Sequence, residues 1–297
     1  MDINFIKYKK IYFIFTAALI ALSLSSLLFF GLNLGIDFTG GSILEIEYVF
    51  GQRPSLETIR QKISDVGAGE ISAQSAGDKG VILRFKSIDE ETHQKILKNL
   101  GGVKIEEKRF ETIGSSVGAE LKRKTVLIIL LAILAMVVYI AIAFRRVSYP
   151  VRSWQYGIAT LFILFHDILI PLGVFSALGK FYGIQITIPV IVAFLTVVGY
   201  AINNVVVVFD RIRENLLKRT FLSFGDTSSK AINQTFARQI NTSLTTLFPL
   251  AFIYFAGGET LRYFALALIV GIVSGLYSSL FLAGPFLVNW LKLSKKS

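Results

Sequence analysis

The sequence predicts a membrane-embedded bundle of six transmembrane α-helices, with one α+β domain inserted between the first two helices. Hydrophobic residues make up 53% of the 297 residues and charged residues only 17%, against about 25% in soluble domains. The mean hydropathy of +0.62 also indicates an integral membrane protein. A transmembrane helix needs about 20 apolar residues. Six runs have about that length: 11–31, 125–144, 154–178, 186–209, 239–256 and 261–291.

Composition divides the chain into three parts. Residues 1–31 hold an N-terminal tail and the first span, and residues 32–118 form a balanced, mostly polar segment. Residues 119–297 hold the other five spans, with an amphipathic loop at 210–238. The first span has a basic start but no small-x-small cleavage site, so we expect an uncleaved anchor and not a signal peptide.

The distribution of charge predicts the orientation. If the N-terminus is cytoplasmic, the cytoplasmic segments hold 15 basic and four acidic residues, including Asp2, Arg145, Arg146, Lys295 and Lys296. The long segment 32–124 is neutral, with 14 of each. Lys and Arg favour the cytoplasmic side, and long exported domains do not count in this rule. We therefore expect both termini in the cytoplasm and the α+β domain outside it. The net charge of +11 then reflects topology and contact with anionic lipids.

The segment between the first two spans has the pattern of a small mixed domain. Period-2 alternation and turn residues predict strands at 43–49, 70–75, 80–86 and 103–111, and helical spacing predicts helices at 55–66 and 89–100. The order β-α-β-β-α-β is that of the split ferredoxin-like motif. The segment has no cluster of catalytic residue types, and we expect His93 on its surface. We therefore expect a protein contact through the open face or an edge of the sheet.

Polar residues inside the apolar spans are the candidate site. Ionisable groups at membrane depth are costly and usually face a bundle interior or a water-filled path, which favours function for Asp167 and Arg238. Arg238 lies near a helix end, where it can also extend to the interface. Thr242 is typical of hydrogen bonding between helices. The site residues are Asn203, Asn204, Arg238, Asp167, His166 and Thr242, and we expect them to converge in the bundle.

Several classes of function are disfavoured. The chain has no cysteine and two histidines, so it offers no disulfide, thiolate site or histidine-rich metal site. No carboxylate cluster with metal-ligand spacing is present, and we expect neither a metal nor another cofactor. No basic face on a soluble domain indicates a nucleic-acid partner. We expect a transport or energy-coupling protein and not an enzyme.

Four segments together resemble the SecF family of the bacterial Sec translocon, and the resemblance covers essentially the whole chain. They are GIDFTGG at 35–41, GYAINNVVVVFDRIREN at 199–215, NQTFARQINTSLTT at 233–246 and FAGGETLRYFALALIVGIVSGLYSSLFLAGP at 255–285. The residues of the first motif that carry the likeness are Gly35, Asp37, Phe38, Thr39, Gly40 and Gly41.

The resemblance implies a bundle related to the RND transporters, in the bacterial cytoplasmic (inner) membrane, and a ferredoxin-like extracytoplasmic domain. It implies pairing with SecD, contact with the SecYEG channel, and YajC and YidC as further candidate neighbours. It also implies that unfolded preprotein meets the extracytoplasmic domain and that the proton gradient supplies the energy.

One position departs from the family pattern. The fourth span of the family usually has an aspartate that carries protons where this chain has Asn204. An amide does not titrate, so it cannot bind and release a proton. Three hypotheses follow: an engineered Asp-to-Asn variant, a natural subunit that leaves proton work to SecD, or transfer of the role to Asp167.

Two other functions remain as alternatives. Half of an RND-like exporter of small apolar molecules would need a large apolar pocket in the exported domain. A non-conducting scaffold that stabilises SecD and SecYEG would need no titrating group, and the amide at Asn204 favours it.

Overall fold

The computed structural model describes residues 4–49, 51–69, 71–101, 104–143, 151–218 and 223–294. The chain forms two compact units. One consists of Met1–Leu32, Ile129–Ile184 and Ile188–Ser297, and the other of Asn33–Ile128 with Gln185–Thr187. Parts of the sequence interpretation lie outside the described residues, namely position 144 of the second span, the charges at Asp2, Arg145, Arg146, Lys295 and Lys296, and positions 219–222 of the amphipathic loop.

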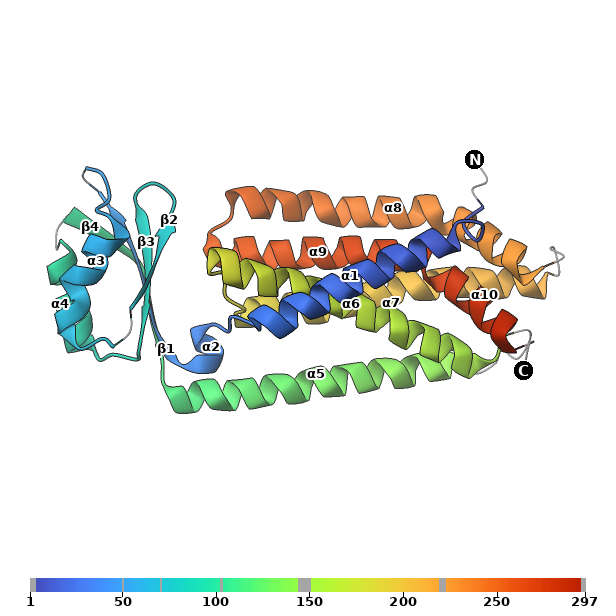
Figure 1. Cartoon of the computed structure of the whole chain (residues 1–297), viewed down its shortest axis with the longest axis horizontal. Coiled ribbons are helices and arrows are strands. Elements are labelled where there is room, and N and C mark those ends of the chain that lie inside the picture. The colour runs from blue at the N-terminus through green and yellow to red at the C-terminus, as the bar shows by residue number, and fades with distance from the viewer. Residues whose placement is uncertain are drawn as a thin grey trace. The chain divides into compact units, whose positions relative to one another are not determined.

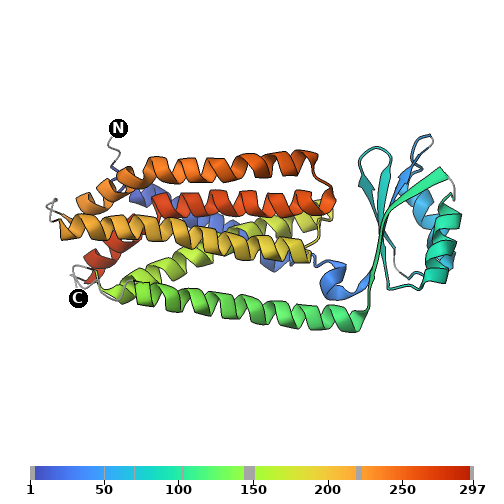
Figure 2. The same ribbon diagram turned by 180° about the vertical axis from the view of Figure 1, so that it is seen from behind.

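The first unit is a bundle of long helices (Figures 1 and 2). Its elements are α1 (Lys9–Phe30), the second half of α5 (Ser115–Ala143), α6 (Ser153–Tyr182), α7 (Ile188–Leu217), α8 (Phe224–Ala256), α9 (Glu259–Phe281) and α10 (Ala283–Ser294). The helices α6, α7 and α9 supply much of the buried core, whereas α1 and α5 are largely exposed. A helix that is apolar all round but exposed is typical of a helix that faces lipid.

Five helical segments of the described chain are long and apolar enough to cross a membrane. They lie in α1, α5, α6, α7 and the pair α9–α10. The helix α8 is not among the five because residues 224–246 carry Arg238, Gln239, Asn241 and a series of hydroxyl residues.

The predicted last span, 261–291, is confirmed as a candidate membrane span with the same bounds, Leu261–Leu291, although a break at Leu282 divides it into α9 and α10. The second half of the predicted amphipathic loop is continuous with the fifth span, because both belong to α8, a helix of 33 residues.

Small residues bring the helices of the bundle together. A Cβ at Gly271 of α9 would lie 2.3 Å from Val197 of α7, and one at Gly173 of α6 would lie 2.4 Å from Ser23 of α1. Ser176 donates hydrogen bonds to the carbonyl groups of Ser26 and Gly31, at 2.9 and 2.6 Å. Such close approach is how helices gain packing energy where lipid removes the hydrophobic driving force.

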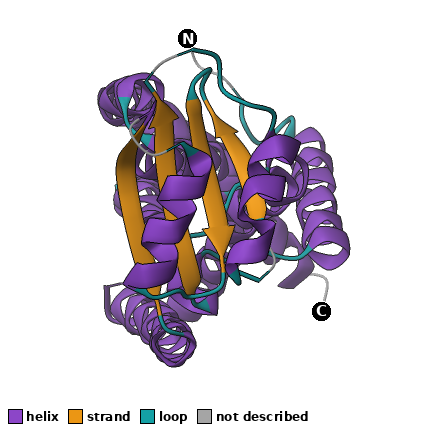
Figure 3. Ribbon diagram, turned by 90° about the vertical axis from the view of Figure 1, so that its left-hand side faces the viewer, coloured by secondary structure: helices purple, strands orange, loops and turns teal. Residues whose placement is uncertain are grey.

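The second unit contains a four-stranded antiparallel sheet in the order β2-β3-β1-β4. The strands are β1 (Gly41–Tyr48), β2 (Ser72–Ala76), β3 (Gly80–Phe85) and β4 (Ile105–Ile113), and α3 (Leu56–Ile63) and α4 (Glu90–Leu100) cover one face (Figure 3). Leu44, Ile46 and Leu83 of the sheet pack with Ile59 and Ile96 of the helices. The side-chain oxygens of Ser55 and Asp89 accept backbone hydrogen bonds that cap α3 and α4.

His93 is buried, contrary to the expectation of a surface residue. It is 4% exposed, and its ring stacks on Phe110 with centroids 3.7 Å apart. Nδ1 lies 3.2 Å from the carboxylate of Glu90, and Nε2 lies 3.2 Å from that of Glu107. Glu107 belongs to β4, at the register shift beside Ile46. The sequence placed His93 on the polar side of its helix, but the bulged strand brings a carboxylate and an aromatic ring over it.

Candidate functional site

A carboxylate lies in the interior of the helical bundle. Asp167 of α6 is 0% exposed, and Ser274 and Ser278 of α9 donate hydrogen bonds to it at 3.2 and 2.7 Å. The Nδ1 atom of His166, also 0% exposed, lies 2.8 Å from Asp167 Oδ1. Gly275 of α9 lies beside the acid, since a Cβ at this position would be 3.7 Å from Asp167 Oδ2, an ordinary contact distance.

The surroundings of Asp167 suit both protonation states of the carboxyl. An ionised carboxylate only accepts hydrogen bonds, whereas a protonated one also donates. Ser278 Oγ lies 2.7 Å from Asp167 and 3.1 Å from the carbonyl oxygen of Gly275. The hydroxyl can therefore donate to the carboxylate, or turn to the carbonyl and accept from a protonated carboxyl. Proton binding would reverse the direction of one hydrogen bond between α6 and α9 without leaving a partner unsatisfied.

Further buried polar groups extend from this acid toward α7 and α8. Gly275 is close to Ala201 of α7, with a hypothetical Cβ 3.2 Å from the alanine Cβ. Asn204, three residues along and on the same side of α7, is 2% exposed, and its Nδ2 has no hydrogen-bond partner among the described residues. The same is true of His166 Nε2 and Gln239 Nε2. Buried polar atoms of this kind usually bind water.

Two of the hydrogen bonds that connect α8 to its neighbours involve buried polar groups of its middle part. Ser279 Oγ of α9 donates to Gln239 Oε1 at 2.6 Å, and Tyr200 Oη of α7 donates to Ser243 Oγ at 3.1 Å. Both acceptors are buried. Together with Asp167, these contacts form what we call the polar core: Asp167, His166, Ser274, Ser278, Asn204, Gln239, Ser279, Tyr200 and Ser243.

The structure brings only some of the predicted residues together. Asp167, His166 and Asn204 belong to the polar core, but Asn203, Arg238 and Thr242 are exposed on the outside of α7 and α8. The Thr242 hydroxyl donates to the carbonyl of Arg238 in its own helix, at 2.8 Å, and not to another helix. The polar stripe of α8, which consists of Arg238, Asn241, Thr242 and Thr245, therefore faces away from the interior of this chain.

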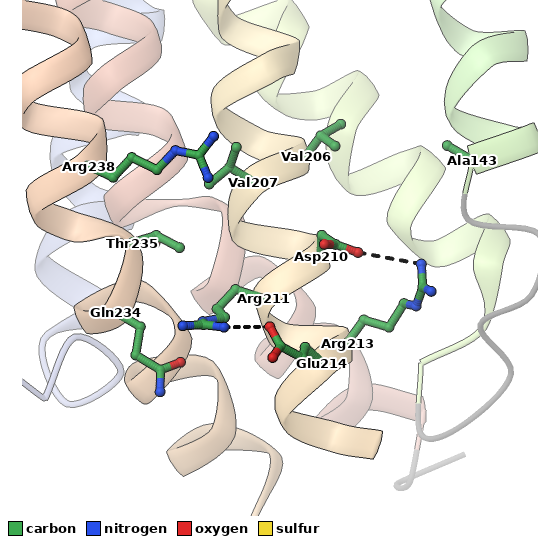
Figure 4. Close-up of a pocket in the computed structure, with 10 residues that line it drawn as sticks. All are labelled: Ala143, Val206, Val207, Asp210, Arg211, Arg213, Glu214, Gln234, Thr235 and Arg238. Atoms are coloured by element: carbon green, nitrogen blue, oxygen red, sulfur yellow. Dashed lines mark hydrogen bonds and ion pairs between the residues drawn. The ribbon is translucent and has the colours of Figure 1, made fainter. Parts of the chain in front are cut away.

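A hollow of about 510 Å³ lies beside Arg238, where α7 and α8 approach the end of α5 (Figure 4). Arg211 pairs with Glu214, and Arg213 with Asp210 at 3.4 Å. No carboxylate among the described residues forms an ion pair with Arg238, whose guanidinium extends toward Val207 in Figure 4. Arg238 thus presents an uncompensated charge on an exposed face of the bundle.

The motif at 35–41 lies in the second unit and includes a short helix, α2 (Ile36–Thr39), that the sequence analysis did not predict. Gly40 and Gly41 have φ angles of +72° and +131°, which residues other than glycine rarely adopt. Ile36 packs with Ile43 and Ile82 against the sheet face that α3 and α4 leave open. Ile36 of the motif is therefore a structural partner of the sheet.

Sequence reasoning missed the serines that hold Asp167. Neither Ser274 nor Ser278 is among the predicted site residues, although their spacing of four residues on one helix, which gives a single face, was a usable signal. Gln239 is not among them either, because its contact with Ser279 joins two spans and could not be read from either one alone. Among the described residues, no group of three or more His, Cys, Asp or Glu side chains could hold a metal ion.

Comparisons with known proteins agree with this architecture. The chain matches the family model "Protein export membrane protein SecD/SecF, C-terminal" over residues 92–293 and the model "SecD/SecF GG Motif" over residues 25–49. It is 38% identical to protein translocase subunit SecF of Thermobaculum terrenum, over 97% of this chain and 94% of the relative. It is 39% identical to the SecF subunit of Desulfurispirillum indicum, over 93% of this chain and 87% of that relative.

Two solved structures are similar over almost the whole chain. The crystal structure of SecDF from Thermus thermophilus superposes with a TM-score of 0.84 at 32% identity, covering 98% of this chain and 39% of that one. A crystal structure of SecDF in the Super-membrane-facing form superposes with a TM-score of 0.70 at 31% identity. The match covers 100% of this chain and 40% of that one. This chain therefore spans about two fifths of the SecDF chains it matches.

Proposed function

Because the chain belongs to the SecD/SecF family of protein-export membrane proteins and is a SecF-type subunit of the protein translocase, we propose that it couples the proton gradient to preprotein translocation. Its immediate partner in this proposal is SecD, since the similar solved structures are named SecDF and this chain covers about two fifths of them. The SecYEG channel, YajC and YidC are further partners, and unfolded preprotein contacts the sheet domain.

The proposed architecture has six spans, with α8 as the fifth, and is RND-like. The 33 residues of α8 correspond to a length of about 50 Å at 1.5 Å per residue. This length is enough to cross a bilayer, although residues 224–246 are rich in polar side chains. The charge distribution supports cytoplasmic termini in a bacterial inner membrane. The strand order β2-β3-β1-β4, with helices after β1 and β3, supports a ferredoxin-like extracytoplasmic domain.

The observation that carries the coupling proposal is the buried carboxylate of Asp167. It accepts hydrogen bonds from two α9 serines, one of which has an alternative acceptor in Gly275. Proton binding at Asp167 would change how α6 is joined to α9. Asn204 lacks a titrating group, which favours Asp167 over position 204 as the proton carrier in this chain.

A second part of the proposal concerns Arg238 and Asn203. An exposed arginine within a membrane span is costly without a partner. We therefore assign the exposed polar face of α7 and α8 to the contact with SecD, which would supply an acidic side chain. The proton path of this complex would run past Asp167 and Asn204 toward Asn203 and Arg238 at the contact.

The scaffold function is the main alternative, and the untitratable Asn204 favours it. An exporter of small apolar molecules receives less support. A hollow of about 360 Å³ at the β2–β3 hairpin is lined by the charged residues Glu45, Glu47, Asp78, Lys79 and Lys108 together with Ile46, Ala76, Gly77 and Gly80. An apolar cargo would not favour such a lining.

The test is preprotein export in membrane vesicles that contain this chain and its SecD partner, with and without a proton gradient. We expect Asp167→Asn to reduce export to the level seen without the gradient. The matched control is Asp210→Asn, the same chemical change at an exposed acid, which should keep the response. We also expect Asn204→Asp to respond as the parent does.

Three outcomes would contradict the proposal. A full gradient response in Asp167→Asn would exclude Asp167 as the carrier. A response that appears only in Asn204→Asp would place the carrier at position 204 and leave this chain uncoupled there. An identical proton leak of the vesicles with and without this subunit would favour the scaffold.

A further inference from the structure

The glycine motif that follows α1 lies where several segments of the sheet unit meet. The Gly35 N–H donates to the carbonyl of Ile186 at 2.8 Å, and the Ile186 N–H donates to the carbonyl of Asn33 at 2.7 Å. Leu34 and Ile186 form a parallel β-bridge. Ile186 belongs to the short connection between α6 and α7, so the chain leaving α1 is hydrogen-bonded to the connection between two other spans.

The atoms of the first turn of α5 that lie nearest to Gly40 of the motif are backbone atoms. A Cβ at Gly40 would lie 2.7 Å from the Cα of Ser115, and one at Gly118 would lie 2.7 Å from the backbone nitrogen of Gly40. Real Cβ atoms essentially never approach so closely. The motif and the start of α5 can approach this closely only because positions 40 and 118 are both glycine. Gly118 is buried in the contact.

The motif then enters the sheet. A Cβ at Gly41 would lie 2.8 Å from the carbonyl oxygen of Phe85, at the end of β3. Gly41 also pairs with Ile113, the last residue of β4, immediately before α5. Next to it, the hydroxyls of Ser42 and Thr112 are 2.7 Å apart. The segment is thus fixed to the sheet and to the start of α5 at the same time.

We propose that residues 35–41, with Ile186 and Gly118, form a rigid joint that passes displacement of α5 and of the α6–α7 connection to the four-stranded sheet during translocation. Contact between backbones leaves no flexible side chain to absorb a shift, and closely packed atoms transmit strain. The inference rests on the proposed function, in which gradient-driven change in the bundle moves the sheet domain. It gives the glycine motif a mechanical role beyond the proposed proton path.

The first test is Gly118→Ala in the gradient-dependent export assay. Alanine is a better helix former than glycine, so the change leaves α5 itself intact but separates it from Gly40. The matched control is Gly157→Ala, since a Cβ at this glycine of α6 meets nothing within 4 Å. We expect Gly118→Ala to lose most of the gradient-stimulated export, with normal export without a gradient and normal SecD co-purification.

A full gradient response in Gly118→Ala, with the parent responding, would overturn the joint and leave the proposed function standing. A parent that shows no gradient response would overturn both. Equal loss of export with and without the gradient, or loss of SecD co-purification, would indicate a merely structural contact and overturn the joint.

The second test locks the joint. The chain has no cysteine, so a single disulfide can be placed with Leu34→Cys and Ile186→Cys. Neighbouring strands lie about 4.8 Å apart, within the Cα range that a disulfide spans. A joint that moves as one body should work equally well oxidised and reduced. Loss of export on oxidation that a reductant restores would show that this contact must open, and would overturn the proposal.

Discussion

Asp167 and Asn204 are both buried in the bundle, but only Asp167 can change its charge. Two serine hydroxyls donate to Asp167 and His166 Nδ1 lies 2.8 Å from it, whereas the donor Asn204 Nδ2 has no acceptor among the described residues. A buried donor without a partner costs about 1–3 kcal/mol unless water binds to it. This contrast at the residue scale favours an ionisable role for Asp167 and a hydrated or packing role for Asn204.

His93 is the buried ionisable residue of the sheet unit whose neighbours decide its role. Its ring lies between two carboxylates and stacks on Phe110. The amide of Gln94 and the ring of His93 also hold the pKa of Glu90 below its ordinary value. These contacts join α4 to β4, the edge strand that leads into α5.

We expect His93→Ala to destabilise the sheet unit by about 2 kcal/mol, because it creates a cavity and removes the group between two carboxylates. Hydrogen exchange of the strand amides in the full-length protein would measure the loss. Gln94→Ala, one position along on the exposed face, should change little. Equal effects of the two variants would show that the buried histidine does not stabilise the unit.

At the scale of elements, the contact between α7 and α9 depends on the absence of side chains. Gly271 and Gly275 face Val197 and Ala201 at spacings that match one helical turn. The close packing of α9 against α7 therefore depends on these two glycines.

We expect Gly271→Ala to destabilise the protein by about 1–3 kcal/mol through overpacking against Val197. The thermal unfolding midpoint in detergent would report it. Val197→Ala in the same chain should recover part of the loss, because the two residues are in contact and their effects are not additive. Additive losses in the double variant would mean that the helices had already shifted apart to accommodate the new methyl group.

At the scale of the whole molecule, the bundle leaves one strongly polar side exposed. Asn203, Arg238, Asn241, Thr242 and Thr245 all lie on the outer faces of α7 and α8. A chain that crossed the membrane alone would present this face to lipid. The structure is therefore that of one subunit of a larger assembly, as the proposed contact with SecD requires.

We expect Arg238→Ala to reduce co-purification of SecD by more than tenfold and to lower export. Removing one partner of a buried charge pair costs about 2–5 kcal/mol. The control is Arg213→Ala, because Arg213 has a partner in Asp210 within its own helix. If export by the Arg238→Ala complex is unchanged, the polar stripe of α8 is structural only.

The sequence by itself determined the membrane class, most spans and the element order of the sheet domain. These depend on local composition and periodicity, which each segment carries alone. Predicted strands at 43–49 and 80–86, for example, correspond to β1 and β3 within two residues. The acid at position 167 and the glycine motif were also recognisable from residue types.

Only the tertiary structure decided which polar residues face one another. Asn203 and Asn204 are adjacent in sequence, yet one is exposed and the other buried, because successive helical residues point about 100° apart. The two serines that donate to Asp167 lie 107 and 111 residues away in sequence. Gly118 contacts Gly40 although the four strands of the sheet lie between them in sequence. Contacts at such separations depend on how helices and strands pack together, and therefore no local sequence pattern predicts them.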